Sequence, residues 1–577
     1  MKKIRKKRQI QMMAAVLVCG ILVTACGKQG GNNTDGNAAA SDAGHADTTA
    51  AQNEKNDTNV ISGAAYTGTT IDTEDLFSDR DLSGAYDASE CSRITLSDAG
   101  CTADSKNVAV DGSIITITGE GDYIVSGTLS DGMIIVDVDK SEKVQLVLNG
   151  VAITSKTSAA IYVKKADKVF ITLSDGMENT LKNGGAFEEI DDNHIDAVIF
   201  SKDDLTFNGT GSLIIDSPAA HGIVSKNELV ITNGAYQISA AAHGMTGKDN
   251  VAIAGGSFQI TAGKDAIQSK NEDDDTLGFV YIADGEFVLS AGSDGVSAVN
   301  EISIADGTVK VQESYEGLEA RIINISGGEI DITSSDDGLN ATDKRASASA
   351  DMEQSAGDDG EGRRKDFQGG RGDFGGGMGD TQADANINIS GGVVRISAEG
   401  DGVDSNGYLT VSGGELYVTG PSNGGNGALD YGIDAVISGG VVVAAGQSGM
   451  AQNFGPESTQ GTILVNTQQQ NAAGSEIMLF DSTGRRLVAW TMEKDYNSVV
   501  VSCPEIEEGS SYTVQTGEVT TEVVMDGLVY GEGFGFGFGG GRSEFQGGRP
   551  DFGNGERPEG MPEPPDFENG ERPEGMQ

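Results

Sequence analysis

The feature that most constrains the fold of this chain is a repeated phrase in which an apolar residue and a Gly-containing corner precede an alternating strand. Successive copies mostly start 21 or 22 residues apart, and the longer spacings contain visible insertions. A repeat this short cannot close its own core, but stacked copies bury a shared apolar column. The copies are ITNGAYQI from Ile231, IAGGSFQI from Ile253, IADGEFVL from Ile282, IADGTVKV from Ile304, ISGGEIDI from Ile325, ISGGVVRI from Ile389, VSGGELYV from Val411 and ISGGVVVA from Ile437.

The repeat predicts strands, because apolar and polar residues alternate and many of the apolar ones are β-branched. A length near 22 residues accommodates two or three short strands and their turns, which is one coil of a parallel β-helix. Gly pairs fit its corners, since Gly adopts positive φ without a Cβ clash. Leucine-rich repeats need a Leu spacing that is missing, and propeller blades need about twice the period. The sequence therefore predicts an all-β parallel β-helix, or solenoid.

Composition divides the chain into five parts. Residues from about Gly27 to Asp79 are rich in Gly, Asn, Asp, Thr and Ala and lack an apolar period, which is typical of a solvated tether. The phrase FQGGRGDFG in the largest insertion nearly recurs in a Gly-, Pro- and Glu-rich C-terminal tail, so both are expected to be disordered. We predict a signal peptide at 1–25, a disordered tether at 26–89, a β-helix at 90–460 with a disordered insertion at about 343–384, a small β cap domain at 461–526 and a disordered tail at 527–577.

The N-terminus indicates export. Six cations precede an apolar run from Met12 to Ala25, which is short and one-sided in charge for a membrane-spanning helix. The stretch Val23-Thr24-Ala25-Cys26-Gly27 resembles a bacterial lipoprotein processing site. That resemblance implies that Cys26 is lipidated and anchors the chain to the outer face of a membrane of the bacterial cell envelope. A plain signal peptide or an uncleaved anchor are the alternatives.

The charge balance limits the class of partner. With 88 Asp and Glu against 39 Lys and Arg, the net charge is -49, which disfavours nucleic acid because phosphate binding needs a basic face. Such acidity suits divalent cations. Five Cys do not make a disulfide scaffold. A local disulfide between Cys91 and Cys101 stays open, and Cys503 has no obvious partner.

A second phrase precedes each Gly corner and places acids at matching positions of successive coils, as in EGLEAR, DGLNAT and DGVDSN. Matching positions in a parallel stack lie about 4.8 Å apart, where carboxylates repel each other unless a cation lies between them. Ca²⁺ prefers such an oxygen shell; the alternative is a solvated acidic ladder without a specific ion. The predicted metal ligands are Glu316, Glu319, Asp336, Asp337, Asn340, Asp401, Asp404, Asp430 and Asp434.

Basic and aromatic residues of the repeat are weaker candidates. One column of cations, spaced one coil apart, is expected either to meet the carboxylates of an acidic polymer or to neutralise neighbouring acids: Lys226, Lys248, Lys270 and Arg321. His221 and His243 also fall one coil apart, but zinc needs more nitrogen or sulfur ligands than are visible, so we expect a structural role. Trp490 is expected in a core rather than as a sugar platform.

The entry segment GEGDYIVSGTLSDGMIIVDVDKSEKVQLVLNGVAI, from Gly119, and the later DDGLN, ISGGE and SYTVQTG phrases resemble a bacterial family of carbohydrate-binding domain-containing proteins, over about residues 90–520. The resemblance implies a right-handed parallel β-helix that binds Ca²⁺ and acidic plant polysaccharide, chiefly polygalacturonate. It also implies a fold similar to polysaccharide lyase family 9, whose members pair a Ca²⁺ cage with a Lys base. Asp336, Asp337, Asn340, Asp401 and Asp404 look like that cage. Neither Arg321 nor Lys344, the nearest basic residues, matches the Lys motif.

Three functions follow as hypotheses. The first is a cell-surface lipoprotein that binds polygalacturonate or a pectin-like polymer through Ca²⁺ and is not an enzyme. The second is a Ca²⁺-dependent polyuronate lyase, which cleaves by β-elimination. The third is a structural or adhesive surface protein without affinity for glycans.

Overall fold

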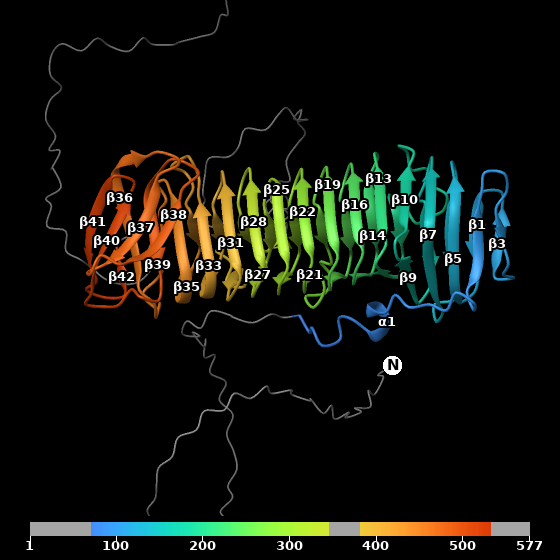
Figure 1. The fold of residues 1–577 in the computed structure, drawn as a ribbon, viewed down its shortest axis with the longest axis horizontal. Coiled ribbons are helices and arrows are strands. Elements are labelled where there is room, and N and C mark those ends of the chain that lie inside the picture. The colour runs from blue at the N-terminus through green and yellow to red at the C-terminus, as the bar shows by residue number, and fades with distance from the viewer. Residues whose placement is uncertain (1–70, 346–380, 532, 534–577) are drawn as a thin grey trace, which may run out of the picture. The chain divides into compact units, whose positions relative to one another are not determined.

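The computed structural model describes residues 71–345, 381–531 and 533. In these residues the chain is almost entirely β and forms a solenoid of about 12 turns with a small antiparallel sheet near its C-terminal end (Figure 1). The predicted fold class is confirmed. The predicted signal peptide, most of the tether, the centre of the insertion and nearly all of the tail lie outside the described residues. Within the described part, no helix is both long and apolar enough to cross a membrane.

Each regular coil contributes three strands. One coil consists of β14 (His221–Ser225), β15 (Glu228–Ile231) and β16 (Ala235–Ala240), and the next of β17 (Met245–Gly247), β18 (Asn250–Ile253) and β19 (Ser257–Ala262). Corresponding strands pair in parallel and in register, as β15 does with β18 and β16 with β19. The chain thus builds three parallel ladders, which we call ladders 1, 2 and 3.

Ladder 1 consists of the short strands, preceded by the antiparallel β3. Besides β14 and β17, it contains β3 (Val108–Asp111), β4 (Ile114–Ile117), β6 (Met133–Asp137), β8 (Ile161–Lys165), β11 (Ala197–Ser201), β20 (Ile267–Ser269), β23 (Val296–Ala298), β26 (Leu318–Ala320), β29 (Leu339–Ala341), β32 (Val403–Ser405) and β34 (Leu429–Tyr431).

Ladders 2 and 3 join through the long strands β5, β7, β33 and β35, which run through both. Besides β15 and β18, ladder 2 contains β1 (Ser92–Leu96), β5 (Gly121–Leu129), β7 (Lys143–Ser155), β9 (Lys168–Leu173), β12 (Asp204–Gly209), β21 (Phe279–Ile282), β24 (Glu301–Ile304), β27 (Ile322–Ile325), β30 (Asn386–Ile389), β33 (Tyr408–Thr419) and β35 (Asp434–Gly446). Besides β16 and β19, ladder 3 contains β10 (Glu178–Asn183), β13 (Ser212–Ser217), β22 (Glu286–Ala291), β25 (Thr308–Glu313), β28 (Glu329–Ser334) and β31 (Val393–Ala398). The short β2 (Thr102–Ala103) pairs with β1.

The core is a continuous stack of the inward-facing residues of all three ladders. Aromatic rings stack in it from coil to coil, with Tyr236 and Phe258 at 5.0 Å and Phe258 and Phe287 at 4.6 Å between centroids. The Gly corners have the predicted conformation: Gly328 has φ +83°, and a Cβ there would lie 2.6 Å from the carbonyl oxygen of Gly307. Close stacking of the coils therefore requires Gly at this corner.

The C-terminal part adds strands to the solenoid and a second sheet beside it. β36 (Thr462–Asn471) and β39 (Tyr496–Ser502) continue from β35 in antiparallel order, and β42 (Val529–Tyr530) pairs with β36. The second sheet has four antiparallel strands and packs through its own apolar core on the outer side of β35, β36 and β39. Trp490 packs against this core and stacks on Tyr417, with 4.3 Å between ring centroids. The second sheet contains β37 (Glu476–Asp481), β38 (Arg486–Thr491), β40 (Ser511–Thr516) and β41 (Val519–Val524).

Residues 71–91 form a strap that runs along the outside of ladder 2 (Figure 1). It includes the helix α1 (Asp79–Leu82), which begins at a capping box on Ser78. Asp81 forms an ion pair with Lys168 at 2.8 Å, and Phe77 contacts the ring of Tyr281. The last part of the predicted tether is therefore bound to the solenoid, because its polar groups find partners there.

The three described cysteines are free thiols. Cys91 is buried with Ile124 and Val147 in a small cluster of its own. Cys101 packs instead against the main core. The disulfide that the sequence leaves open is thus not formed.

Candidate metal centre

The outer side of ladder 1 brings together most of the acids that the repeat predicts. Glu319, Asn340 and Asp404 are in register on β26, β29 and β32. The acids that precede these strands lie beside them. Two groups have carboxylate oxygens within 4.8 Å of one another: cluster A, consisting of Asp294, Glu316 and Glu319, and cluster B, consisting of Asp337, Asp401 and Asp404.

The local sequence explains this placement. In β26, Leu318 and Ala320 point into the core, so Glu319 between them points outward. The Gly after each leading acid allows the coils to approach, since a Cβ on Gly317 would lie 2.3 Å from the carbonyl oxygen of Gly338. The three-residue strand and its preceding acid and Gly therefore stack acids on acids from coil to coil.

Cluster A contains a cation from the protein itself. Lys344, at the start of the large insertion, forms an ion pair with Glu319, and its Nζ lies 3.8 Å from Asp294 and 3.2 Å from Ser297 Oγ. Partial burial lowers the pKa of Lys344, but Glu319 and Asp294 outweigh this effect and hold that pKa above its ordinary value. Lys344 is therefore protonated at neutral pH, and an ammonium group in that state cannot act as a general base.

The carboxyls of cluster A remain crowded despite this cation. Burial, followed by a hydrogen bond and the charge of Glu319, raises the pKa of Asp294 to about 9. Burial and the charge of Glu319 raise the pKa of Glu316 to about 8. Cluster A is thus close to neutral at pH 7, because Asp294 and Glu316 retain their protons and the charge of Glu319 is balanced by that of Lys344.

Cluster B has no such partner. Among residues 71–345 and 381–531, no Lys or Arg is recorded in an ion pair with Asp337, Asp401 or Asp404. Burial and the charge of Asp336 raise the pKa of Asp337 to about 7, and burial raises that of Asp401 to about 8. The pKa of Asp404 is raised well above its ordinary value by burial and by the charges of Asp337 and Asp401. A cation at this point would relieve that repulsion.

The potential metal ligands of cluster B and of the residues beside it are oxygen atoms. Asp337 Oδ1 accepts a hydrogen bond of 2.6 Å from the Asp401 backbone, which fixes its carboxylate. Asn340 donates to Glu316 Oε1 at 3.1 Å, while Asn340 Oδ1 and Glu316 Oε2 are buried and have no hydrogen-bond partner among the described residues. Carboxylate and amide oxygens without nitrogen or sulfur ligands fit Ca²⁺ rather than zinc.

Two of the predicted ligands, Asp434 and Asp336, lie outside clusters A and B. Asp434 does not lie in the column: it begins β35 on ladder 2, pairs with Tyr408, and its Oδ1 accepts a hydrogen bond of 2.9 Å from Ala435 N. The residue in register with Asp404 is Asp430, whose Oδ1 accepts a hydrogen bond from Gln452 at 2.6 Å. Asp336 lies at the edge of cluster B, where its carboxylate interacts with the Tyr315 hydroxyl.

The residues predicted for the site leave out two of its members, Asp294 and Lys344. Asp294 occupies the leading position of its phrase, DGVSAV, and that shared position was a signal for including it. Lys344 was recognised as one of the two nearest basic residues, but its contact with Glu319 was not predicted, because Lys344 comes from an insertion and matches no position of the repeat.

The predicted basic column lies at the corner between ladders 1 and 2. Arg321 is occupied by an ion pair with Asp384 at 3.5 Å, and its side chain is only 13% exposed. Lys248 pairs with Asp273 at 3.2 Å, and Lys226 lies over the ring of Phe200. Lys270 has a pKa lowered by burial and by the charge of Lys226. Of the four, the three Lys belong to coils that precede clusters A and B.

The two His of the repeat stack on each other, with 5.0 Å between ring centroids and 1° between planes. Burial lowers the pKa of His221 to about 4, so its ring is neutral at neutral pH. His243 Nδ1 lies 3.1 Å from Asp265. These contacts agree with the structural role expected from the sequence.

Fold and site together define a parallel β-solenoid with an acidic, oxygen-lined face. Residues 111–360 match the family described as "Carbohydrate-binding domain-containing protein", the family that the sequence phrases resemble. The matched residues include cluster A and, from cluster B, Asp337 alone.

One curated protein and one solved structure are similar to part of the chain. A protein of Acetivibrio thermocellus with the same description is 43% identical over 128 residues, which are 22% of this chain and 45% of that protein, so the match spans less than half of the relative. A solved structure, described as the polysaccharide lyase-like protein from C. thermocellum in a gadolinium derivative, is 36% identical. It covers 41% of this chain and 97% of its own, with a TM-score of 0.40.

Proposed function

We propose that the chain is a binding protein for an acidic polysaccharide of the polygalacturonate type, which it holds through Ca²⁺ at cluster B. The family match supports a carbohydrate partner. The observation that carries the proposal is cluster B itself: three carboxylates from two adjacent coils, with oxygens within 4.8 Å of one another, raised pKa values and no ion-paired cation in the described chain.

The chemistry of the two partners makes a bridging ion necessary. Both this chain, with a net charge of -49, and a polyuronate are anionic, so they repel without a counterion. Ca²⁺ takes about six to eight oxygen ligands. Asp337, Asp401 and Asp404 supply part of that shell and leave positions for a carboxylate of the polymer.

The N-terminal sequence supports a place for this binding at the cell surface. Lipidation of Cys26 would hold the chain at the outer face of a membrane while the solenoid contacts polymer outside. Mass spectrometry of the unmodified chain and of a Cys26→Ser variant tests this directly: in the native host the unmodified chain should carry an acyl mass on Cys26, and the variant should lack it. A Cys26 without an acyl mass in the unmodified chain would contradict the anchor.

Calorimetry with Ca²⁺ and a purified oligogalacturonate tests ion and glycan together. We expect glycan binding only with Ca²⁺ present, and its loss in Asp337→Asn and Asp404→Asn. Glu286→Gln is the matched control, because it removes an exposed carboxylate on ladder 3 and should change neither affinity. Binding that is unaffected by EDTA would refute the Ca²⁺ bridge, and absence of any glycan binding would refute the ligand.

The same mixture distinguishes a binder from a lyase. β-Elimination of a polyuronate creates an unsaturated, ultraviolet-absorbing product. We expect no steady increase of that absorbance, because Lys344, the cation beside the clusters, is protonated and paired with Glu319. A steady increase that disappears in Asp337→Asn would establish catalysis instead.

A further inference from the structure

Tyr315 is the most exposed aromatic residue in the part of the chain that the structure describes. It is 52% exposed, whereas Tyr86, the other exposed aromatic residue there, is 36% exposed. A single exposed ring is common on protein surfaces and indicates nothing by itself. What distinguishes Tyr315 is its position and the way in which its ring is held.

The backbone places Tyr315 at the corner between ladders 3 and 1, directly before Glu316 of cluster A. Its N–H donates to the carbonyl of Ser293 in the preceding coil at 2.7 Å, and its carbonyl accepts from Asp336 N in the following coil at 2.9 Å. Asp336 in turn directly precedes Asp337 of cluster B. Tyr315 therefore lies one coil, about 4.8 Å at the usual strand separation, from the corner that leads into cluster B.

A hydrogen bond to that next coil holds the ring. The Tyr315 hydroxyl donates to the carboxylate of Asp336, and this bond, followed by the charge of Asp336, raises the pKa of Tyr315 to about 12. The hydroxyl therefore keeps its proton and remains a donor at neutral pH. A ring that is already fixed at its polar end loses little conformational freedom when a ligand packs on it.

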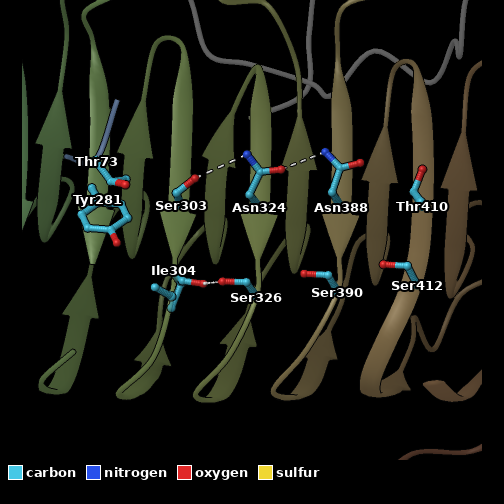
Figure 2. Close-up of a pocket in the computed structure, with 11 residues that line it drawn as sticks. Thr73, Tyr281, Ser303, Ile304, Asn324, Ser326, Asn388, Ser390, Thr410 and Ser412 are labelled. Atoms are coloured by element: carbon cyan, nitrogen blue, oxygen red, sulfur yellow. Dashed lines mark hydrogen bonds between the residues drawn. The ribbon is translucent and has the colours of Figure 1, made fainter. Parts of the chain in front are cut away.

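Tyr281 on the outside of ladder 2 shows the contrast. It lines a groove of small polar side chains (Figure 2), but its ring contacts Phe77 of the strap, with 6.3 Å between centroids. For Tyr315, no contact with another aromatic ring is recorded among residues 71–345 and 381–531. Its ring is therefore open to a ligand beside the metal centre, whereas the strap already packs on Tyr281.

The chemistry of the metal site leaves a task for such a ring. Ca²⁺ at cluster B would bind carboxylates of any polyanion, so the ion alone does not distinguish a polyuronate from a polymer without sugar rings. A pyranose ring also has an apolar C–H face, and an aromatic ring offers a flat apolar surface for it.

We propose that Tyr315 stacks on the sugar residue next to the uronate held by Ca²⁺ and thereby makes the site selective for sugar polymers over other polycarboxylates. This inference rests on the Ca²⁺-dependent glycan binding proposed above and adds to it the residue that determines specificity. The Ca²⁺ ion supplies the attraction between two anionic partners, and the aromatic ring recognises the sugar.

Calorimetry of Tyr315→Ala, with Ca²⁺ and the same oligogalacturonate, tests the proposal. We expect the glycan affinity to fall about tenfold, while the affinity for Ca²⁺ alone and for poly-glutamate with Ca²⁺ stays within about twofold. Tyr315→Phe keeps the ring and should retain the glycan affinity within about threefold. Tyr86→Ala is the matched control, because it removes the exposed ring of the strap and should change none of these affinities.

The outcomes separate this inference from the proposed function. An unchanged glycan affinity in Tyr315→Ala would overturn the stacking and leave the Ca²⁺ bridge intact, whereas an unmodified chain that binds Ca²⁺ but no oligogalacturonate would refute both. Equal losses of affinity for Ca²⁺ alone and for glycan would mean that Tyr315 acts only through Asp336, which would also overturn the stacking.

Tyr315→Trp gives a second measurement that does not depend on a loss of binding. The chain has a single Trp, so the emission of the introduced indole is measured against the constant background of Trp490. We expect the emission to shift to shorter wavelength when oligogalacturonate is added with Ca²⁺, because the sugar removes water from the ring. Poly-glutamate with Ca²⁺ should cause no such shift. The absence of a shift with oligogalacturonate, or an equal shift with both polymers, would contradict the proposal.

Discussion

Clusters A and B lie on the same ladder and derive from the same repeated phrase, yet they solve the problem of crowded carboxylates differently. In cluster A the ammonium of Lys344 lies beside Glu319 and Asp294, and Asp294 retains a proton. In cluster B the described chain provides no ion-paired cation, and all three carboxyls have raised pKa values. The stacked acids alone therefore do not define a metal site.

The difference originates outside the repeat. Lys344 stands at the start of the large insertion, so its ammonium reaches the coils before the insertion and not those after it. A resident ammonium group competes with a divalent ion for the same oxygens. We therefore expect one cation, at cluster B, and the following predictions test this asymmetry from its largest consequence to its smallest.

The largest effect is expected from removing a carboxylate of cluster B. Asp404→Asn should weaken Ca²⁺ binding about 100-fold, or about 2.7 kcal/mol, because it removes a charged ligand from a set of three. Asp294→Asn should change the affinity less than about threefold, since Lys344 already balances its cluster. Calorimetry of Ca²⁺ alone measures both. Equal losses in the two variants would show that clusters A and B form one site.

Replacing Lys344 should make cluster A resemble cluster B. The side chain is 41% exposed, so Lys344→Met is expected to destabilise the chain without Ca²⁺ by about 1–2 kcal/mol, less than for a fully buried pair. With Ca²⁺ present, the binding stoichiometry should increase by one ion. Denaturant unfolding and calorimetry check the two effects. An unchanged stoichiometry would mean that cluster A does not bind Ca²⁺ even without the ammonium group of Lys344.

How far the sequence predicts this asymmetry depends on whether a residue belongs to the repeat. The repeat fixes the core: Leu318 and Ala320 alternate with Glu319, so the fold and the outward direction of this acid follow from period and pattern. The stacking of Glu319, Asn340 and Asp404 follows in the same way. The contact of Lys344 with cluster A could not be predicted in this way, because an insertion has no period that relates it to the coils it contacts.

The prediction for the final coil was wrong for one of its two acids. Both Asp430 and Asp434 were predicted as ligands of the column, but Asp434 begins a strand of ladder 2. The inward position of the phrase is instead occupied by Leu429, which pairs with Val403, so Asp430 is the aligned acid. Inward apolar residues determine register because a slip would move them out of the core. They are therefore a better guide than the acids.

Stability without Ca²⁺ should fall as pH rises. Folding raises the pKa of Asp337 to about 7 and that of Asp401 to about 8, so the folded state binds these protons more tightly than the unfolded chain does. The resulting stabilisation is complete near pH 4 and is lost as pH rises toward 8. In EDTA we expect Tm at pH 8 to be about 3–5 °C below Tm at pH 5.5. Saturating Ca²⁺ should remove most of that difference, and its persistence would place the titrating groups elsewhere.

The smallest effect is expected at Asp434. It tests whether an acid must be aligned with Asp404 in ladder 1 to affect Ca²⁺ binding, or whether any nearby acid does so. Asp434 lies on ladder 2 and accepts a hydrogen bond from Ala435 N, whereas Asp430 continues the column next to Asp404. Asp434→Asn should therefore leave Ca²⁺ affinity within about twofold, because a charge outside the ion's shell is screened. Asp430→Asn, which changes a carboxyl next to the shell, should weaken binding about fivefold. The reverse order would show that the ion lies one corner further along the last coil, between β34 and β35.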